Sequence, residues 1–423
     1  MRIGLFTYGS RGDVQPYIAL ALRLMQEGFD VTLGAPENFK AFVESFGVTF
    51  FGLYGNAEEI IYSAECQKII KSGNNLAFVK FLFSALSDRS GELFSGILSF
   101  CEGVDVVIAN NVGATTVSVA TEYLKLPLLI LQLNPPVIET TAFPLPGVRI
   151  PNYARLNRLS YRLFYRLMWH FAKRDIIAFR KQLALPNAKT SVYHYINTKK
   201  IPVMHAFSEA LISRPADWDN HQVVTGFITL DEQARTHNRF DATNPELVAW
   251  IKSGTKPIYI GFGSIPVPDP LKLRQMIADI LEQTNERIIL CQGWSILPDI
   301  PKNDRLFIIV SANHQWLFRQ CKMVVSHGGI GTLTAAMKAG VPVIVISIFV
   351  DQPIWGDIIT KKKLGIHLPW RKINTKKLVN AIQVINQEPD YGNRVAAVAQ
   401  VLNREDGTGA VIIFMKKWLL TST

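Results

Sequence analysis

Short apolar runs alternate with helical patterns along most of the chain, which is typical of parallel α/β domains. Apolar residues at helical spacing predict a helix over 17–28 after a loop at 8–16, and others near 39–46, 93–101, 114–123, 246–252 and 271–284. Strands are predicted at 3–7, 30–34, 48–53, 104–109, 128–132, 202–208, 222–227, 257–265, 287–291, 306–310, 323–326 and 343–348. Because both halves alternate in this way, we predict two α/β domains, the second beginning with the strand at 222–227.

Composition narrows the class of protein without identifying it. The 423 residues are 48% hydrophobic and 19% charged, as expected for a globular protein of two or three domains. Four widely spaced cysteines without a CxxC pair indicate neither a zinc site nor a disulfide framework, which fits a reducing cytosol. The N-terminal apolar run is too short for a signal peptide, and no run of 18 apolar residues predicts a membrane span. The net charge of +11 favours an anionic partner.

The basic charge is concentrated in residues 149–185, which hold nine Lys or Arg and one acid, Asp175. A helix is predicted there with Arg155, Arg158, Arg162 and Arg166 beside a stripe of Leu156, Leu159, Leu163, Leu167 and Phe171. Interleaved aromatic residues make a membrane surface one interpretation of region 155–181. A domain helix with a solvated basic face is the other, and both stay open. Nucleic acid is disfavoured because no nucleic-acid motif accompanies the basic residues.

The richest candidate chemistry follows the strand at 323–326. The sequence His327-Gly328-Gly329-Ile330-Gly331-Thr332 predicts a glycine turn that opens a helix, where unpaired N–H groups stabilise a phosphate. His327 adds a donor, and the next strand delivers Asp351 and Gln352 to the same sheet edge, where they can hold hydroxyl groups. A sugar attached to a phosphate is therefore predicted, against the alternative of a tight turn and a solvated polar pair. The stretch lacks GxxxxGK[ST] and a dinucleotide fingerprint.

Several stretches together resemble the family-1 glycosyltransferases of GT-B fold, most closely the sterol glucosyltransferases and the bacterial glycosyltransferases of antibiotic tailoring. The matching stretches occur in the family's order at 9–24, 214–227, 256–265, 293–297 and 314–357. The resemblance implies an α/β fold of GT-B type, with two Rossmann-like parallel-sheet domains facing a central cleft. It implies an acceptor-binding domain at 1–220, a nucleotide-sugar-binding domain at 221–395 and a helical tail at 396–423 that packs back on the N-terminal domain.

The resemblance also implies an inverting, metal-independent transfer of a sugar from a UDP-sugar, expected to be UDP-glucose, to a lipophilic acceptor such as a sterol. No cofactor is expected, because the UDP-sugar is a substrate. Asp13 matches the proposed catalytic base. Residues that match donor-binding positions are Ser10, Arg11, Gly12, Ser264, Trp294, Gln315, Trp316, His327, Gly329, Gly331, Thr332, Asp351 and Gln352. Among them, Gln315 and Trp316 fall in the uracil-binding turn, and Asp351 and Gln352 match the pair that holds sugar hydroxyls.

Some alternatives stay open at this level. Asp13 could form a loop salt bridge with Arg11, and Asp217-Trp218-Asp219 looks like a metal-binding DxD motif but lies in a linker-like context, so a structural role is preferred. Two departures from the family are Ser326, where many relatives have a histidine, and residues 364–370. The alternatives in function are a glycosyltransferase of a polyketide, phenolic or peptide natural product, an epimerase or phosphorylase of the same plan, and a catalytically silent sugar-nucleotide or lipid-binding protein. The expected location is cytoplasmic, or peripheral on a membrane through region 155–181.

Overall fold

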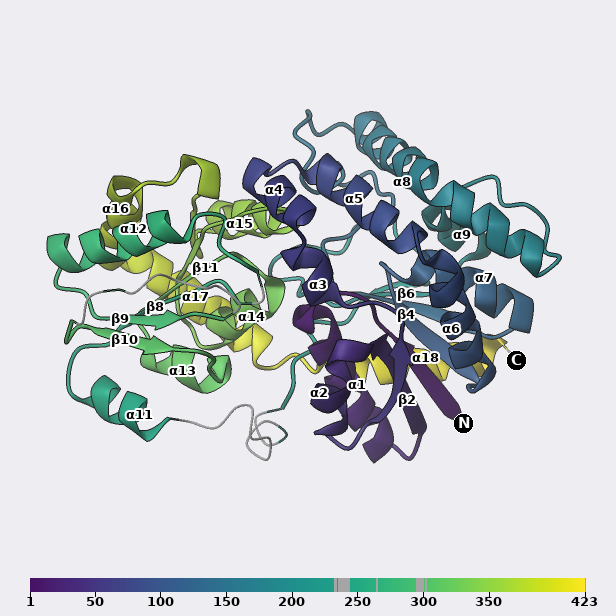
Figure 1. Ribbon diagram of the computed structural model, residues 1–423, viewed down its shortest axis with the longest axis horizontal. Coiled ribbons are helices and arrows are strands. Elements are labelled where there is room, and N and C mark those ends of the chain that lie inside the picture. The colour runs from purple at the N-terminus through teal and green to yellow at the C-terminus, as the bar shows by residue number, and fades with distance from the viewer. Residues whose placement is uncertain (232–233, 235–243, 264, 294–299, 301–302, 423) are drawn as a thin grey trace. The chain divides into compact units, whose positions relative to one another are not determined.

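The computed structural model describes residues 1–231, 234, 244–263, 265–293, 300 and 303–422 (Figure 1). The chain divides into two compact units. The first consists of Met1–Ile60, Leu76–Leu230 and Glu405–Thr423, and the second of Ile61–Asn75 and Asp231–Arg404. The sequence placed the boundary at residue 220 and treated the first half as continuous. The chain instead changes unit at Leu230, and the segment 61–75 joins the second unit.

A seven-stranded parallel sheet forms the core of the first unit. Its order is β3 (Thr49–Leu53), β2 (Asp30–Pro36), β1 (Arg2–Phe6), β4 (Val106–Asn110), β5 (Leu128–Gln132), β6 (Val203–His205) and β7 (Gln222–Val224). The expectation that residues 222–227 begin the second domain is wrong, because β7 pairs with β6 in the first sheet through Val203 and Gln222. An apolar strand signals its own conformation but not its partner.

A six-stranded parallel sheet forms the core of the second unit. Its order is β10 (Leu306–Ile309), β9 (Ile288–Cys291), β8 (Ile258–Gly261), β11 (Met323–Ser326), β12 (Val343–Val345) and β13 (Gly365–His367). The predicted alternation of strands and helices is thus confirmed in both halves. The strands β8, β9, β11 and β12 are buried on both faces, which explains why they read as continuous apolar runs.

Helices cover the sheets. Those of the first unit are α1 (Arg11–Gln26), α2 (Lys40–Glu44), α6 (Ser90–Glu102), α7 (Ala114–Leu124), α8 (Ala154–Gln182), α9 (Val192–Lys199) and α18 (Gly407–Ser422). Those of the second are α4 (Ala64–Ser72), α11 (Pro245–Lys252), α12 (Pro270–Gln283), α13 (His314–Gln320), α14 (Ile330–Lys338), α15 (Gln352–Lys361), α16 (Thr375–Gln387) and α17 (Pro389–Leu402). Helices α3 (Ala57–Tyr62) and α5 (Asn75–Ser87) span the points where the chain changes unit, and 3-10 turns occur at Glu37–Phe39 and Trp370–Lys372.

Helix α1 begins at Arg11, so the expectation of a loop over 8–16 is wrong. Ser10 caps the helix through a capping box with Asp13, which satisfies the first backbone N–H groups. Pro16 lies inside the helix, where its fixed φ is compatible with helical backbone although it removes one hydrogen bond. The local capping box therefore starts the helix before the proline.

Each sheet has one point where the strand order changes direction. The chain runs outward from β1 to β2 and β3 and then returns to β4, so β1 and β4 flank this point in the first sheet; β8 and β11 flank it in the second. Ligands of open α/β sheets bind at the carboxyl ends of such strand pairs. In the first unit, Asn110 bridges the pair: its Nδ2 donates to Tyr8 O at 2.9 Å and its Oδ1 accepts from Gly113 N at 2.9 Å.

The C-terminal tail consists of α17 and α18, separated by a short break. Helix α18 belongs to the first unit and is attached to α1 there: Lys416 Nζ lies 2.8 Å from Glu27 Oε2, and Arg23 pairs with Asp406 at 3.7 Å. A Cβ on Gly407 would lie 2.5 Å from Phe227 O, so a glycine is needed where the tail passes β7's loop. The chain thus returns to its first unit after completing the second.

The four cysteines are buried and not paired with one another. Among the described residues, no helix is long and apolar enough to cross a bilayer.

Asn110 allows a stability test of the β1–β4 junction. Replacing it with alanine leaves the Gly113 N–H and the Tyr8 carbonyl buried without their partner, so we expect Asn110→Ala to lower the free energy of unfolding by about 2 kcal/mol. Urea titration measures the change in the free energy of unfolding, and hydrogen exchange of the β1 and β4 amides shows whether the loss is local to this junction. The control is the exposed Asn386, whose side chain donates to Glu286: Asn386→Ala should cost less than about 0.5 kcal/mol. Equal effects would contradict the bridging role of Asn110.

Candidate functional site

His327 lies directly after β11, at the carboxyl edge of the second sheet. Its ring is packed between two glycines: a Cβ on Gly329 would lie 2.4 Å from Nε2, and one on Gly263 would lie 3.3 Å from Cε1. Burial lowers the pKa of His327 to about 4, so the imidazole is uncharged at neutral pH. Its buried Nδ1 has no hydrogen-bond partner among the described residues. A buried polar atom of this kind points to a ligand that completes it.

The glycine turn beside His327 brings backbone N–H groups to the same place. Gly328 has φ +92°, and a Cβ there would lie 2.6 Å from Val345 Cγ1, so only glycine fits. Gly329 is the N-cap of α14, and no side chain caps this helix. A Cβ on the exposed Gly331 would meet nothing within 4 Å. The first turn of α14 therefore presents uncapped N–H groups to open space, which favours an anion.

Asp351 and Gln352 lie at the start of α15, after β12. Gln352 is buried, and its Oε1 accepts from the backbone N–H groups of Ile348 at 2.8 Å and Phe349 at 3.3 Å. Asp351 Oδ2 accepts from Trp355 Nε1 at 3.1 Å. Part of this polar pair therefore holds its own loop in shape. The amide nitrogen of Gln352 is the end not engaged in these bonds.

The loop before Asp351 carries backbone strain that sequence analysis missed. Val350 has φ +58°, which is a rare conformation for a β-branched residue and costs about 1–3 kcal/mol. Its N–H donates to Asn75 Oδ1 at 3.0 Å. Asn75 ends the segment 61–75 that groups with the second unit. No sequence signal marks Asn75, because the contact joins positions that are remote along the chain.

A second missed feature is a chain of three polar side chains behind the loop. Ser347 Oγ lies 2.7 Å from His367 Nε2, and His367 Nδ1 lies 2.8 Å from Asp357 Oδ1. A Cβ on Gly356 would lie 2.6 Å from the His367 ring, so a glycine is needed there to leave room for the imidazole. The order matches a serine–histidine–aspartate triad, but Ser347 is buried, which suits a positioning role better than a nucleophile. His367 lies in 364–370, the stretch that departs from the family.

The start of α13 is fixed to the centre of the same sheet. Asn313 caps the helix by accepting from the N–H groups of Gln315 at 3.1 Å and Trp316 at 3.3 Å. His314 Nε2 lies 3.0 Å from the Tyr259 hydroxyl on β8, and α13 packs beside α14. Gln315 and Trp316, both partly exposed, are thus held near the glycine turn. The predicted contacts Ser264 and Trp294 lie outside the described residues.

The predicted residues of the first unit form the start of α1, after β1. Asp13 Oδ2 accepts from Ser10 N at 2.8 Å and Ser10 Oγ at 3.1 Å, and the N–H of Gly12 donates to Ser10 Oγ at 3.3 Å. Burial raises the pKa of Asp13, although both bonds from Ser10 oppose the shift. The Arg11 guanidinium lies over the Phe42 ring at 4.5 Å. Asp13 is therefore a capping residue whose carboxylate is a stronger base than an exposed aspartate.

The DxD-like stretch has a structural role. Asp217 accepts from Thr140 Oγ1 at 2.6 Å and from the Thr141 N–H at 2.7 Å, which fixes the loop after β5. Trp218 stacks on His205 with ring centroids 4.2 Å apart. Within the part of the chain that the structure describes, no three His, Cys, Asp or Glu side chains gather as a metal site would require.

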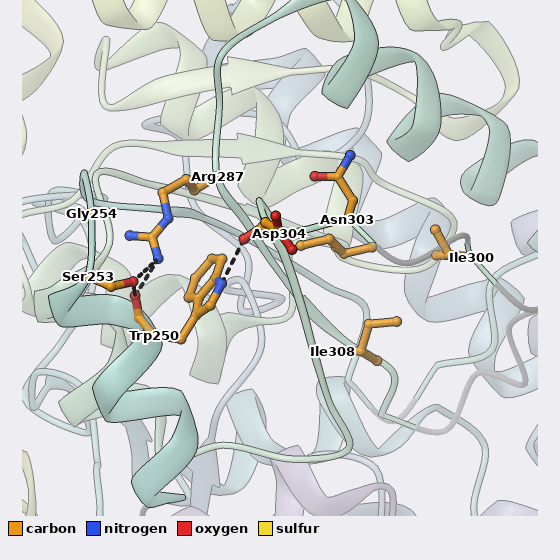
Figure 2. Close-up of a pocket in the computed structure, with 9 residues that line it drawn as sticks. Trp250, Ser253, Gly254, Arg287, Ile300, Asn303, Asp304 and Ile308 are labelled. Carbon is orange, nitrogen blue, oxygen red and sulfur yellow. Dashed lines mark hydrogen bonds between the residues drawn. The ribbon is translucent and has the colours of Figure 1, made fainter.

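The second unit also contains a cavity of about 660 Å³ near the amino ends of β9 and β10 (Figure 2). Arg287 lines it and stacks on Trp250 at 3.8 Å, while its guanidinium donates to the carbonyls of Trp250, Ile251 and Thr255 at the end of α11. The Trp250 indole in turn donates to Asp304 O at 2.9 Å. The arginine thus completes a helix C-terminus. The cavity lies at the opposite sheet edge from His327.

Comparisons with known proteins find relatives over most of the chain. Residues 3–142 match the glycosyltransferase family 28 N-terminal domain, and residues 275–406 match the erythromycin biosynthesis protein CIII-like C-terminal domain. A sterol 3-beta-glucosyltransferase of Arabidopsis thaliana is 32% identical, over 97% of this chain and 67% of that enzyme. An uncharacterized glycosyltransferase of Mycobacterium leprae is 29% identical, over 96% and 94%.

Among solved structures, the glycotransferase of kitacinnamycin has a TM-score of 0.68 at 15% identity, covering 97% of this chain and 98% of that one. At this identity the likeness concerns the fold alone. It confirms the predicted fold class of two parallel-sheet α/β domains.

The two glycines that flank the start of α14 give contrasting expectations for stability. Gly329→Ala would force a Cβ against the His327 ring, and we expect it to lower the free energy of unfolding by about 1–3 kcal/mol. Gly331→Ala enters open space within a helix and should be neutral or stabilising by up to about 1 kcal/mol. Thermal unfolding of the two variants measures the difference. A tolerated Gly329→Ala would contradict the packing of His327.

Proposed function

The chain belongs to the family-1 glycosyltransferases of GT-B fold, and we propose that it transfers glucose from UDP-glucose to a hydroxyl group of a lipophilic acceptor such as a sterol. The structural observation that carries the donor side is the uncharged His327 with an unpartnered Nδ1 beside the uncapped start of α14. The acceptor class is suggested by the sterol 3-beta-glucosyltransferase of Arabidopsis thaliana, and the donor by the sequence resemblance.

Departure of the diphosphate develops negative charge that the protein must stabilise. In this proposal, the N–H groups of the first turn of α14, with Thr332, bind the phosphate oxygens, and their fixed dipoles stabilise the leaving group in place of a metal ion. His327 donates one further hydrogen bond from its neutral ring. Ser264 is proposed as another diphosphate contact by resemblance.

The rest of the donor is proposed to bind along the same sheet edge. Trp316 and Gln315 would contact the uracil base from the start of α13, with Trp294 contributing by resemblance. Asp351 and the amide nitrogen of Gln352 would bind the hydroxyls of the sugar. The strained backbone at Val350 and the bonds from Ile348 and Phe349 fix these two side chains before the donor arrives, which lowers the entropic cost of binding.

Asp13 is proposed as the general base. Its Oδ2 is engaged by Ser10, which leaves Oδ1 to accept the proton of the acceptor hydroxyl as the oxygen attacks the anomeric carbon. A single displacement of this kind inverts the configuration of that carbon. The raised pKa of Asp13 favours proton transfer. Ser10, Arg11 and Gly12 are proposed to shape this turn near the donor.

The decisive experiment measures UDP release from UDP-glucose, with a chelator present, across sterols, lipid alcohols, phenols and polyketide aglycones. We expect release with the sterols or lipid alcohols, and a fall in kcat of about 10²–10⁴ in Asp13→Asn. Because the pKa of Asp13 is raised, activity should be lost on acidification at a pH above the usual aspartate range near 4.

Glu27→Gln, at the other end of α1, is the matched control and should keep activity. Release only with phenols or polyketides would reassign the acceptor. Donor binding without release for any acceptor would favour the silent-binder alternative, and activity restored only by a divalent cation would contradict metal independence.

Donor affinity tests the anion site separately. Gly331→Ala places a methyl group where nothing else lies, so stability should be kept while the Kd for UDP rises roughly tenfold as phosphate contact is blocked. Calorimetric titration with UDP measures this, and TDP serves as the competing nucleotide. Gly392→Ala, another glycine with open space around its Cβ position, is the control. Unchanged affinity in Gly331→Ala would move the diphosphate away from α14.

A further inference from the structure

Helix α8 turns its leucine stripe toward solvent. Leu156, Leu159, Leu163 and Leu167 are 37–53% exposed, although a helix of a water-soluble domain normally buries such a stripe. The buried face is formed by a different set of residues: Asn157, Ser160, Tyr161, Tyr165, Ala172, Ile176, Phe179 and Arg180. The basic face of α8 is solvated, as the domain-helix alternative expects, but the leucine stripe is exposed as well.

Hydrogen bonds on the buried face fix this orientation. Asn157 Nδ2 donates to Thr141 O at 2.7 Å, and Ser160 Oγ accepts from the Leu145 N–H at 2.8 Å. Further along, the Tyr165 hydroxyl donates to Val137 O at 2.9 Å. Rotation of α8 to bury the leucines would break these bonds and leave several buried polar groups without partners. The exposed stripe is thus a built feature of the first unit.

The leucine stripe is bordered by positive charge. Successive helix positions are about 100° apart, so Arg155, Arg158, Arg162 and Arg166, each one residue before a leucine, form a parallel stripe. Arg158 and Arg162 both approach Glu139, at 3.8 and 3.3 Å. Arg155 and Arg166 have no carboxylate partner among the described residues. The exposed Lys173, Arg174 and Lys181 extend the charge toward the end of the helix.

More apolar surface precedes the helix. Tyr153, next to the first residue of α8, is 67% exposed, and Val148 and Ile150 are each 37% exposed. Tyrosine favours the boundary between lipid and water because its ring is apolar and its hydroxyl polar. Exposed apolar residues therefore continue along the chain from residue 148 to Leu167. Helix α8 lies on the outside of the unit (Figure 1).

We propose that α8 and residues 148–153 dock the first unit on an anionic lipid bilayer. The leucines and Tyr153 enter the boundary of the acyl chains, and the arginine stripe contacts lipid phosphates. Nucleic acid fits less well, because phosphate contacts would leave four leucines in water. A bilayer can bury the apolar face of a single convex helix because lipids adapt to its shape. A protein partner would need a complementary groove to do the same.

This surface is connected to the acceptor side of the first unit. Helix α8 holds the loop after β5 through hydrogen bonds at Val137, Thr141 and Leu145. The turn that carries Asp13 follows β1 of the same parallel sheet, so this loop and this turn lie at the same sheet edge, where the strands have their carboxyl ends. A docked α8 would thus bring that edge close to lipid, where a lipophilic acceptor is concentrated. This last step rests on the proposed function, whereas the docking itself does not.

The test is co-sedimentation of the full chain with phosphatidylcholine vesicles, with and without phosphatidylserine, in the absence of donor. We expect binding to the anionic vesicles, weakened by salt. Leu159→Ser/Leu163→Ser should lower the partition coefficient by at least about tenfold. Arg155→Gln/Arg166→Gln should lower it by roughly fivefold for each arginine. Leu271→Ser/Ile413→Ser removes two side chains of 65% and 71% exposure elsewhere and should leave binding unchanged.

UDP binding and transfer to a detergent-dispersed acceptor are measured on every variant. Cooperative thermal unfolding like that of the parent shows that the first unit of a variant is folded, and absent transfer in the parent protein overturns the proposed function while the vesicle result stands. The docking proposal is overturned if the parent protein binds neither vesicle, or if the leucine variant binds as well as the parent. The proposal is also overturned if the stripe mediates self-association instead: the parent protein would then be an oligomer that does not bind vesicles, and the leucine variant would be smaller. Tighter binding of the parent protein to duplex DNA than to anionic vesicles would overturn it too.

Discussion

The proposed donor site of the second unit depends on the close packing of His327 against two glycines at the junction of β8 and β11. Any side chain at position 329 would strike the imidazole, and the same glycine leaves α14 without a capping side chain. Gly329 therefore leaves room for the His327 imidazole and also leaves the first N–H groups of α14 uncapped beside it. Burial in that seat keeps the imidazole uncharged, so the attraction for an anion comes from helix N–H groups and hydrogen bonding rather than from a titrating charge.

Support for this edge comes from behind the loop that follows β12. The bonds among Ser347, His367 and Asp357 connect β12, β13 and α15, while Asn75 holds the N–H of the strained Val350. A strained backbone persists only where its surroundings fix it. These side chains therefore belong to the site through the residues they position, as Gln352 does by binding the N–H groups of its own loop.

Features set by local sequence were predictable, and features set by long-range pairing were not. The strand before His327 and the helix after it follow from an apolar run and a glycine turn, both local. Asn75 and His367 lacked any signal because their partners are distant along the chain or lie in a stretch that departs from the family. The start of α1 was predicted too late, although Ser10 and Asp13 form a local capping box, and β7 was correctly predicted as a strand but assigned to the wrong sheet.

Helix α8 shows a more general limit of periodicity. Its sequence carries a leucine stripe and, on another face, polar and aromatic residues with the same helical spacing; a periodic pattern alone does not say which face meets the core. The structure resolves this because the loop after β5 offers carbonyl and N–H groups, which Asn157, Ser160 and Tyr165 can satisfy and leucine cannot. Satisfying that buried backbone turns the leucines outward. An amphipathic helix whose polar residues are required inside the protein therefore leaves its apolar residues exposed at the surface.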